Sequence, residues 1–462
     1  MKPHPRDFLR DFKAKLHPRE LKAKLIKWWR SDGGIIMDIL GVSGSTIFAF
    51  FMDLFKATEK WFAYGILIVF FILFHRLKRN LSGLQQLLLW LVVILNLAIV
   101  AVVKAGILET LVIEHMGDWR YAIPRKASDP KDIVIVMIDR ETQERFGSDM
   151  LSYRKYHGEL LRRISQAHPK VVGFDLFFSG ESKDDSVFAT AIRQSFCHVV
   201  LAKHYNDLSG AHEPISTTLV RALRDKAGTG DLSFQIGHTR LGKDDDHVVR
   251  KVNLVTHKGE HHFALSVWLS AASGRLARAN RAELRVQLSD ASPAKIPLNR
   301  EGELYINYTK AKFFTLPYNQ ILSANSKVSA FTDKIVLIGA EDDRDVSSVP
   351  DFPSLGTMYG VEIMANAVAT LMSGHYIKKP PDVAYLFFVL ICLWINLHGF
   401  VRLGSSANIV KLKPVPYIWE AGAMLLLIIA AQLLWNWWFD FFYLLFTLVS
   451  TYTALRVLNR FF

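Results

Sequence analysis

Residues 132–138 read DIVIVMI, residues 170–178 read KVVGFDLFF and residues 198–202 read HVVLA. Short apolar runs rich in β-branched residues predict buried strands. Between them, residues 155–167 carry leucine and isoleucine at helical spacing, and residues 184–195 begin with the cap signal Asp-Asp-Ser. Strands that alternate with helices in this way predict a parallel sheet with right-handed crossovers.

The same pattern returns later in the chain. Residues 303–308 and 334–339 predict two further strands, and residues 361–373 predict a helix that ends at Gly374. Residues 204–300 are more polar and are expected to form an inserted or peripheral antiparallel part. We therefore predict one α/β domain with a mixed sheet.

Apolar segments lie on both sides of this domain. The last four are close to the length of a membrane-spanning helix, whereas the first carries polar residues and the second is short, so these two would cross together or lie at the interface. The segments are residues 35–55, 61–74, 86–108, 383–401, 416–435 and 440–455. The predicted fold class is thus an integral membrane protein with six transmembrane helices, three before and three after an extracytoplasmic α/β domain. The predicted regions are a basic leader (1–34), an N-terminal membrane region (35–112), the central domain (113–382) and a C-terminal membrane region (383–462).

The charge distribution predicts an orientation. The formal net charge is +13, and lysine and arginine gather beside the apolar segments. This distribution favours contact with anionic lipids over nucleic acid, and the positive-inside bias places both termini in the cytoplasm. The leader predicts an amphipathic helix on the membrane surface. Its membrane-surface residues are Lys22, Lys24, Lys27, Trp28, Trp29 and Arg30.

Five sequence pieces follow one another in the central domain: Ile138–Thr142, Tyr153-Arg154-x-x-His157, Val172–Phe178, Lys334–Ala340 and Gly360–Ala367. Taken in this order, they resemble the CHASE type-two family of extracellular sensory domains. The resemblance covers about residues 130–381 and the three-helix module that follows. It implies a domain outside the inner membrane, helices that usually lead to a cytoplasmic cyclase or kinase domain, and a homo-oligomer. Because the chain stops at Phe462, we expect no fused output domain.

Polar residues near the predicted strand ends are the candidate ligand-binding groups. Asp139 and Asp175 would approach one another if their strands are adjacent, and Arg154 and His157 precede the intervening helix. Carboxylates beside arginine and histidine at the carboxyl edge of a sheet could bind a polar ligand. The alternative is structural: Asp139 would cap the following turn, and Asp175 would pair with Arg154.

Two further groups of residues carry competing interpretations. Glu362 and Asn366 lie four apart on one helix face and could bind a ligand or brace the neighbouring loop 341–353. A histidine-rich stretch with a nearby acidic run has the ligand types of a transition-metal site, but its predicted hairpin favours a solvated loop, so we predict no metal. That stretch contains His257, His261 and His262, with Asp244, Asp245, Asp246 and His247 nearby.

Three functions remain open at this point. We find no nucleophile elbow, HExxH motif, phosphate-binding loop or dinucleotide fingerprint, so we expect no enzyme and no cofactor. The first function is a sensor that acts through a separate cytoplasmic or membrane protein. The second is a scaffold or anchoring subunit of an envelope assembly. The third is a transporter or channel, which the scattered polar residues of the apolar segments do not favour.

Overall fold

The structure is a computed structural model that describes residues 57–78, most of residues 130–378, and scattered positions between 86 and 121 and between 383 and 430. The chain divides into two compact units. The first contains Met1–Gly117, Pro380–Ala431 and Phe439–Phe462, and the second contains Asp118–Lys379 and Gln432–Trp438. The described part of the second unit is the predicted α/β domain.

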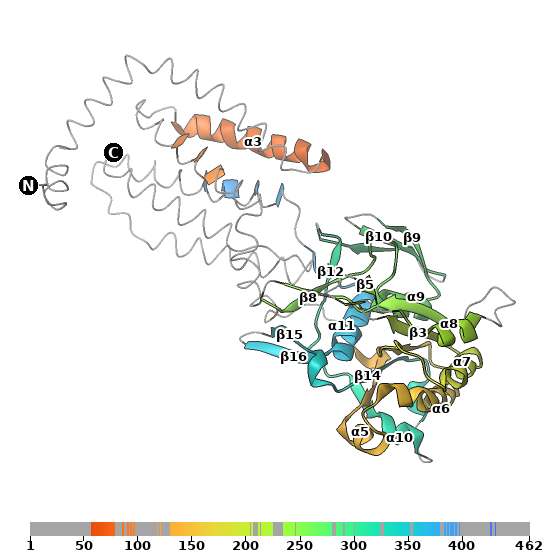
Figure 1. Ribbon diagram of the computed structural model, residues 1–462. Helices are drawn as coiled ribbons and strands as arrows, with labels where there is room; N and C mark the ends of the chain where they lie inside the picture. Colours follow the sequence, from red (N-terminus) through yellow and green to blue (C-terminus); the bar gives the residue numbers. More distant parts are fainter. Residues whose placement is uncertain are drawn as a thin grey trace, which may run out of the picture. The chain divides into compact units, whose positions relative to one another are not determined.

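A six-stranded parallel sheet forms the centre of the α/β unit (Figure 1). Its strand order is β13-β1-β14-β2-β3-β6, and every pairing is parallel. The strands are β1 (Ile133–Ile138), β2 (Val171–Phe174), β3 (His198–Lys203), β6 (Phe234–His238), β13 (Phe314–Pro317) and β14 (Ile335–Ala340). Because β14 pairs with both β1 and β2, the carboxyl ends of these three strands lie together.

Helices cover both faces of this sheet, which explains why its four inner strands are mostly apolar. Alternate residues of these inner strands enter two separate cores, whereas the edge strands β6 and β13 contribute to one core only. One core contains α6, α7, α8 and α10, and the other contains α9 and α11. The helices are α5 (Arg140–Phe146), α6 (Arg154–Ser165), α7 (Asp185–Arg193), α8 (Thr217–Arg224), α9 (Phe263–Ala271), α10 (Tyr318–Leu322) and α11 (Gly360–Ser373). Short 3-10 turns are η3 (Pro130–Asp132), η4 (Met150–Tyr153), η5 (Val328–Phe331) and η6 (Asp343–Asp345).

Antiparallel strands form smaller sheets beside the central one. One has the order β11-β10-β9, a second has the order β12-β8-β7, and β15-β16 and β4-β5 are two-stranded. These strands are β4 (Tyr205–Asn206), β5 (Ala211–His212), β7 (Leu241–Lys243), β8 (Val249–Asn253), β9 (Arg275–Ala279), β10 (Glu283–Gln287), β11 (Ala294–Pro297), β12 (Glu303–Tyr305), β15 (Val346–Asp351) and β16 (Ser354–Tyr359).

Most predicted elements of the α/β domain are confirmed. Parallel and antiparallel strands are both present, but they occupy separate sheets rather than one. The region 204–300 is not wholly peripheral, since it also supplies β6 to the central sheet and α9 to its core. The helix predicted over 361–373 is α11, and Gly374 ends it in the left-handed conformation that glycine adopts easily.

The described part of the first unit is mainly α3 (Ala57–Lys78), which extends beyond the predicted segment 61–74. Among the residues that the structure describes, no helix combines the length and apolar character needed to cross a bilayer. The leader with its six membrane-surface residues and segments 35–55 and 440–455 lie outside the described residues. So do most of 86–108 and 416–435 and about half of 383–401.

Candidate functional site

Asp139 and Asp175 follow β1 and β2, which are not neighbours in the sheet. β14 lies between them and pairs with both, so the strand adjacency on which the approach of these two carboxylates depended is not present. The Asp175 backbone N–H donates to the carbonyl of Ile338 at 2.8 Å, at the end of β14. The reason is topological: the last strand of the domain returns to the middle of the sheet, and nothing in the local sequence of β1 or β2 indicates this.

The side chain of Asp139 caps α5. Its Oδ1 atom accepts hydrogen bonds from the backbone N–H of Thr142 at 2.9 Å and from the Thr142 hydroxyl at 2.6 Å. This satisfies a helix N-terminal donor that would otherwise have no partner. The Thr142 hydroxyl in turn accepts from the backbone N–H of Asn319 at 3.3 Å. Asp139 therefore takes the structural alternative and links the starts of α5 and α10.

Asp175 is half-buried at the same edge of the sheet. Burial, together with the negative charge of Asp345, raises the pKa of the Asp175 carboxyl well above its usual value. Asp345 itself lies against Gly360 at the start of α11, where an added Cβ would collide with its carboxylate. Partial solvent access combined with a perturbed carboxyl group is characteristic of functional positions, so Asp175 remains a candidate for ligand contact.

Arg154 pairs with Asp185 and not with Asp175. The Arg154 Nε atom lies 3.3 Å from Asp185 Oδ1, and both side chains are almost fully buried. The guanidinium also lies 4.4 Å from the ring centroid of Phe178. Burial lowers the pKa of Arg154, and Asp185 partly opposes this. The expected pair with Asp175 is wrong because Arg154 begins α6, which packs against α7, and Asp185 begins α7.

The partners of Asp185 extend this buried pair to a third helix. Its Oδ2 atom accepts from the backbone N–H of Ser182 at 3.1 Å and contacts the hydroxyl of Ser216, just before α8. Glu181 accepts from the backbone N–H of Thr217 at 2.8 Å. These contacts join the starts of α7 and α8 to Arg154, which indicates a structural role for this arginine.

His157 lies in an aromatic cluster of the same core. Its Nδ1 atom is 2.8 Å from the hydroxyl of Tyr318, and its ring centroid is 5.5–5.9 Å from those of five aromatic residues. They are Tyr153, Phe174, Phe178, Phe188 and Tyr318. Burial, with a smaller effect of Arg154, lowers the pKa of His157 to about 3. A neutral histidine with almost no exposure cannot contact a soluble ligand without a change in the fold.

Glu362 and Asn366 brace α11. The Glu362 carboxylate accepts from the backbone N–H of Tyr359 at 3.0 Å, as part of a capping box. Asn366 accepts from the backbone N–H of Thr309 at 3.0 Å and donates to the carbonyl of Glu362 at 2.9 Å. Outside its own helix, Asn366 also donates to the Met358 sulfur on β16 at 3.6 Å, so it binds Thr309 and Met358 and not the loop 341–353.

The six predicted residues therefore do not form one site. Arg154 and His157 meet in a buried core, Asp139 and Asp175 lie on either side of β14, and Glu362 and Asn366 support α11. The predicted ligand-binding role stays a prediction, and Asp175 carries it best.

The histidine-rich stretch is distributed among other roles. His262 Nδ1 accepts from the backbone N–H of Ala264 and caps α9, and its ring is buried 5.1 Å from that of His238. Asp244 and Asp246 bond Arg250 instead. In the described part of the chain, no three histidine, cysteine or acidic residues are placed to hold a metal ion.

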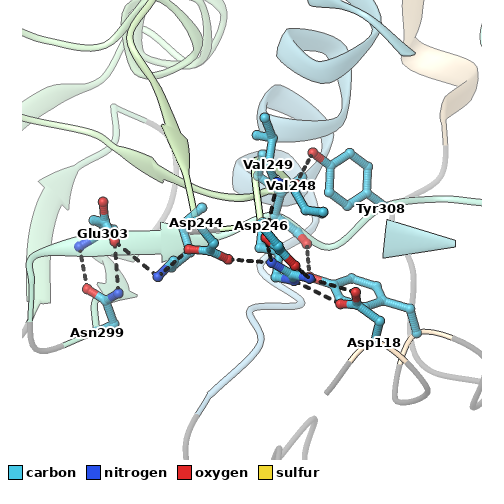
Figure 2. A network of polar contacts seen from close by, with 12 residues as sticks. Asp118, Asp244, Asp246, Val248, Val249, Asn299, Glu303 and Tyr308 are labelled. Carbon is cyan, nitrogen blue, oxygen red and sulfur yellow. Dashed lines mark hydrogen bonds and ion pairs between the residues drawn. The ribbon is translucent and has the colours of Figure 1, made fainter. Parts of the chain in front are cut away.

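Arg250, on β8, is the centre of a buried ionic network that the sequence did not predict (Figure 2). Its guanidinium donates to both carboxylate oxygens of Asp118, at 2.8 and 2.6 Å. It also donates to Asp244 at 2.8 Å and to Asp246 at 2.9 and 2.7 Å. Burial lowers the pKa of Arg250, but these three carboxylates raise it more strongly, so the net shift is upward. The arginine side chain is only 5% exposed.

Lys251 extends the network to β12. Its ammonium lies 2.8 Å from Asp244 and 3.7 Å from Glu303. Glu303 is held by Asn299, which donates to its carboxylate at 3.1 Å and accepts from its backbone N–H at 2.7 Å (Figure 2). Charge-assisted bonds of this kind fix the relative positions of the groups that they join.

Comparison with known proteins identifies the family. A family model described as the CHASE2 domain matches residues 87–403, which is more than half of the chain. The chain belongs to the CHASE2 domain family. CHASE2 domains are typically extracellular sensory domains. No curated protein and no solved structure gives a significant match.

The CHASE2 match includes the whole described α/β unit, together with the Arg250 network. A sequence signal for that network exists, because the acidic run 244–246 is followed closely by the basic pair Arg250-Lys251. On a hairpin such as β7–β8, residues on facing strands come together. The third carboxylate, Asp118, is 132 residues away from Arg250 and has no such signal.

Proposed function

We propose that this protein is a non-catalytic bacterial membrane sensor whose CHASE2 domain responds to a condition outside the cytoplasm and acts through a separate partner protein. Membership of the CHASE2 family carries this proposal, because the family is one of sensory domains. The absence of catalytic motifs in the sequence supports the non-catalytic part of the proposal.

The proposed location is the inner membrane, with the CHASE2 domain in the periplasm and both termini in the cytoplasm. The apolar segments on both sides of the domain and the basic residues beside them support this arrangement. Anionic lipids would contact the basic leader, and a homo-oligomer would fit a sensor of this family.

A scaffold or anchoring subunit is the second candidate, and one structural observation favours it. Arg154, His157 and Asn366 are among the six residues with the best chemistry for a ligand, yet each is buried and bonded within the protein. A domain that serves only to contact other proteins needs such internal bonds for its own stability, and it needs no ligand site.

Partner identification separates these candidates. The full chain, expressed at natural levels and purified in mild detergent, would be analysed by mass spectrometry of co-purifying proteins. A kinase or cyclase recovered in stoichiometric amounts supports the sensor, and a structural envelope complex supports the scaffold. Recovery of a homo-oligomer that conducts ions, with neither partner, would refute both.

Reporter fusions test the orientation independently. A reporter placed after Phe462 is expected to be active in the cytoplasm, and one placed near residue 210 is expected to be active in the periplasm. A periplasmic signal after Phe462 would contradict the proposed topology.

A further inference from the structure

The beginning and the end of the α/β unit are attached to one short segment, residues 304–309. The unit begins at Asp118, and its described end is the stretch His375–Lys378. In the chain, Asp118 follows the predicted N-terminal membrane region, and residues beyond 378 lead into the predicted C-terminal one. The bonds at segment 304–309 therefore involve both connections of the domain.

The incoming connection is held by Arg250 and by two tyrosines. Asp118 forms the two-bond contact with the Arg250 guanidinium, at 2.8 and 2.6 Å (Figure 2). Three residues later, the buried Tyr121 donates from its hydroxyl to the carbonyl of Ile306 at 3.4 Å, and its ring lies edge-on to that of Tyr308. The Tyr308 hydroxyl donates to the carbonyl of Val249 at 2.9 Å, beside Arg250.

The outgoing connection is held by Asn307. Its side-chain amide donates to the carbonyl of His375 at 2.9 Å, directly after α11. Its backbone N–H donates to the hydroxyl of Thr370 at 3.0 Å, within α11. The next residues of the chain, Tyr376 and Ile377, are 7% and 3% exposed and belong to the adjoining core.

One backbone hydrogen bond joins these two attachments. The Ile306 N–H donates to the Arg250 carbonyl at 2.9 Å, which extends the β8–β12 pairing by one step. Arg250, whose side chain binds Asp118, is thus bonded through its backbone carbonyl to Ile306, the residue before Asn307. We propose that Arg250 and Asn307 form a coupled clamp, in which release of the incoming connection at Asp118 also loosens the outgoing connection at His375.

The geometry supports coupling over two independent anchors. Arg250 is buried among three carboxylates, so a weakened contact with Asp118 leaves charges that must rearrange around it. Movement of Arg250 acts directly on the bond to Ile306, because both belong to the same end of the strand pair. The biological role of this clamp rests on the proposed sensor function, because the clamp would connect the two membrane regions through the domain. Its physical test is independent of any partner.

Hydrogen exchange followed by mass spectrometry on the full chain in mild detergent tests the clamp. Asp118→Asn removes one charge and weakens the contact with Arg250. We expect about tenfold faster exchange both in the peptide that contains Asp118 and in the peptide that contains His375, a change of about 1.4 kcal/mol in opening free energy. The peptide of α6 is expected to exchange as in the wild type. Asp342→Asn is the matched control, because Asp342 forms the same two-bond contact with Arg344 on the surface.

The reverse experiment uses Asn307→Ala, which removes the bond to His375. Coupling between two sites is reciprocal, so this variant is expected to raise exchange at Asp118 as well. In the double variant, the two effects are expected to be less than additive. Wild-type exchange at His375 in Asp118→Asn, or at Asp118 in Asn307→Ala, would overturn the clamp. If Asp118→Asn also speeds exchange in the α6 peptide, its effect is not confined to the clamp. The exchange at Asp118 in Asn307→Ala then decides alone whether the two connections are coupled. A clamp without any co-purifying signalling protein would refute the sensor and leave the clamp intact.

Discussion

Replacing His157 is expected to remove a defined part of the acid sensitivity of the α/β unit. His157 is 2% exposed, and its folded-state pKa is lowered to about 3, first by burial and then by Arg154. In the unfolded chain, its pKa returns to about 6.5. Between these two values, the unfolded state binds more protons than the folded state, so the stability contribution is present above pH 6.5 and is lost as the pH falls.

The size of the effect follows from the two pKa values. At pH 5, the unfolded imidazole is almost fully charged and the folded one is neutral, which lowers the free energy of unfolding by about 2 kcal/mol relative to high pH. His157→Gln removes this titration and leaves a side chain that can still bond the Tyr318 hydroxyl. Between pH 8 and pH 5, the free energy of unfolding of the variant should fall by about 2 kcal/mol less than that of the wild type. Any packing defect acts equally at both pH values and cancels in this difference.

The buried thiol of Cys197 reports the unfolding of this core. In a Cys392→Ser background, urea unfolding of the full chain in detergent would be followed by the reaction of Cys197 with dithiodipyridine, which proceeds at acidic pH. A difference of about 2 kcal/mol corresponds to roughly 1 M in the urea midpoint. Phe188→Leu is the control, because it disturbs the ring that packs on His157 without changing a titratable group. An equal acid shift in the wild type and in His157→Gln would refute the reasoning.

Three further predictions concern stability, measured by the same urea assay. Arg154→Met leaves Asp185 buried without its cation and is expected to cost about 3–5 kcal/mol, and adding Asp185→Asn should recover part of this loss, since the uncompensated charge is gone. Gly339→Ala places a Cβ only 2.4 Å from a neighbouring side chain and is expected to cost about 1–3 kcal/mol. Gly158→Ala lies within helix α6 and its Cβ has its nearest contact at 3.5 Å, so this variant should be neutral or stabilising by up to about 1 kcal/mol. Asp175→Asn should stabilise the domain by about 1 kcal/mol at pH 8, because the raised pKa of Asp175 in the folded state means that folding disfavours its charged carboxylate. The gain should vanish below pH 3.8, where the carboxyl group is protonated in both the folded and the unfolded state.

The strands and helices of the α/β domain could be predicted because each carries a local signal. β1 and β14 are continuous apolar runs, and they are buried on both faces as such runs require. The strand order carries no local signal. β14 enters the sheet between β1 and β2 after about 160 intervening residues, and its sequence suits any central position of a parallel sheet. The approach of Asp139 and Asp175 was conditional on that order, and the condition is not met.

The candidate site was harder to predict for a related physical reason. Arginine and histidine near strand ends suggest a ligand because charged side chains are seldom fully buried. Here, Arg154 is buried because Asp185 compensates its charge, and His157 is buried because it remains neutral beside Tyr318. Both conditions depend on residues distant in the sequence or on a different helix. The same holds for Arg250, where two of the three carboxylates lie within six residues and the third lies 132 residues away. Buried charges in this domain thus depend on contacts between residues that lie far apart in the sequence. Among the three carboxylates around Arg250, the one most distant in the sequence is Asp118, and it joins the domain to the chain leading into it.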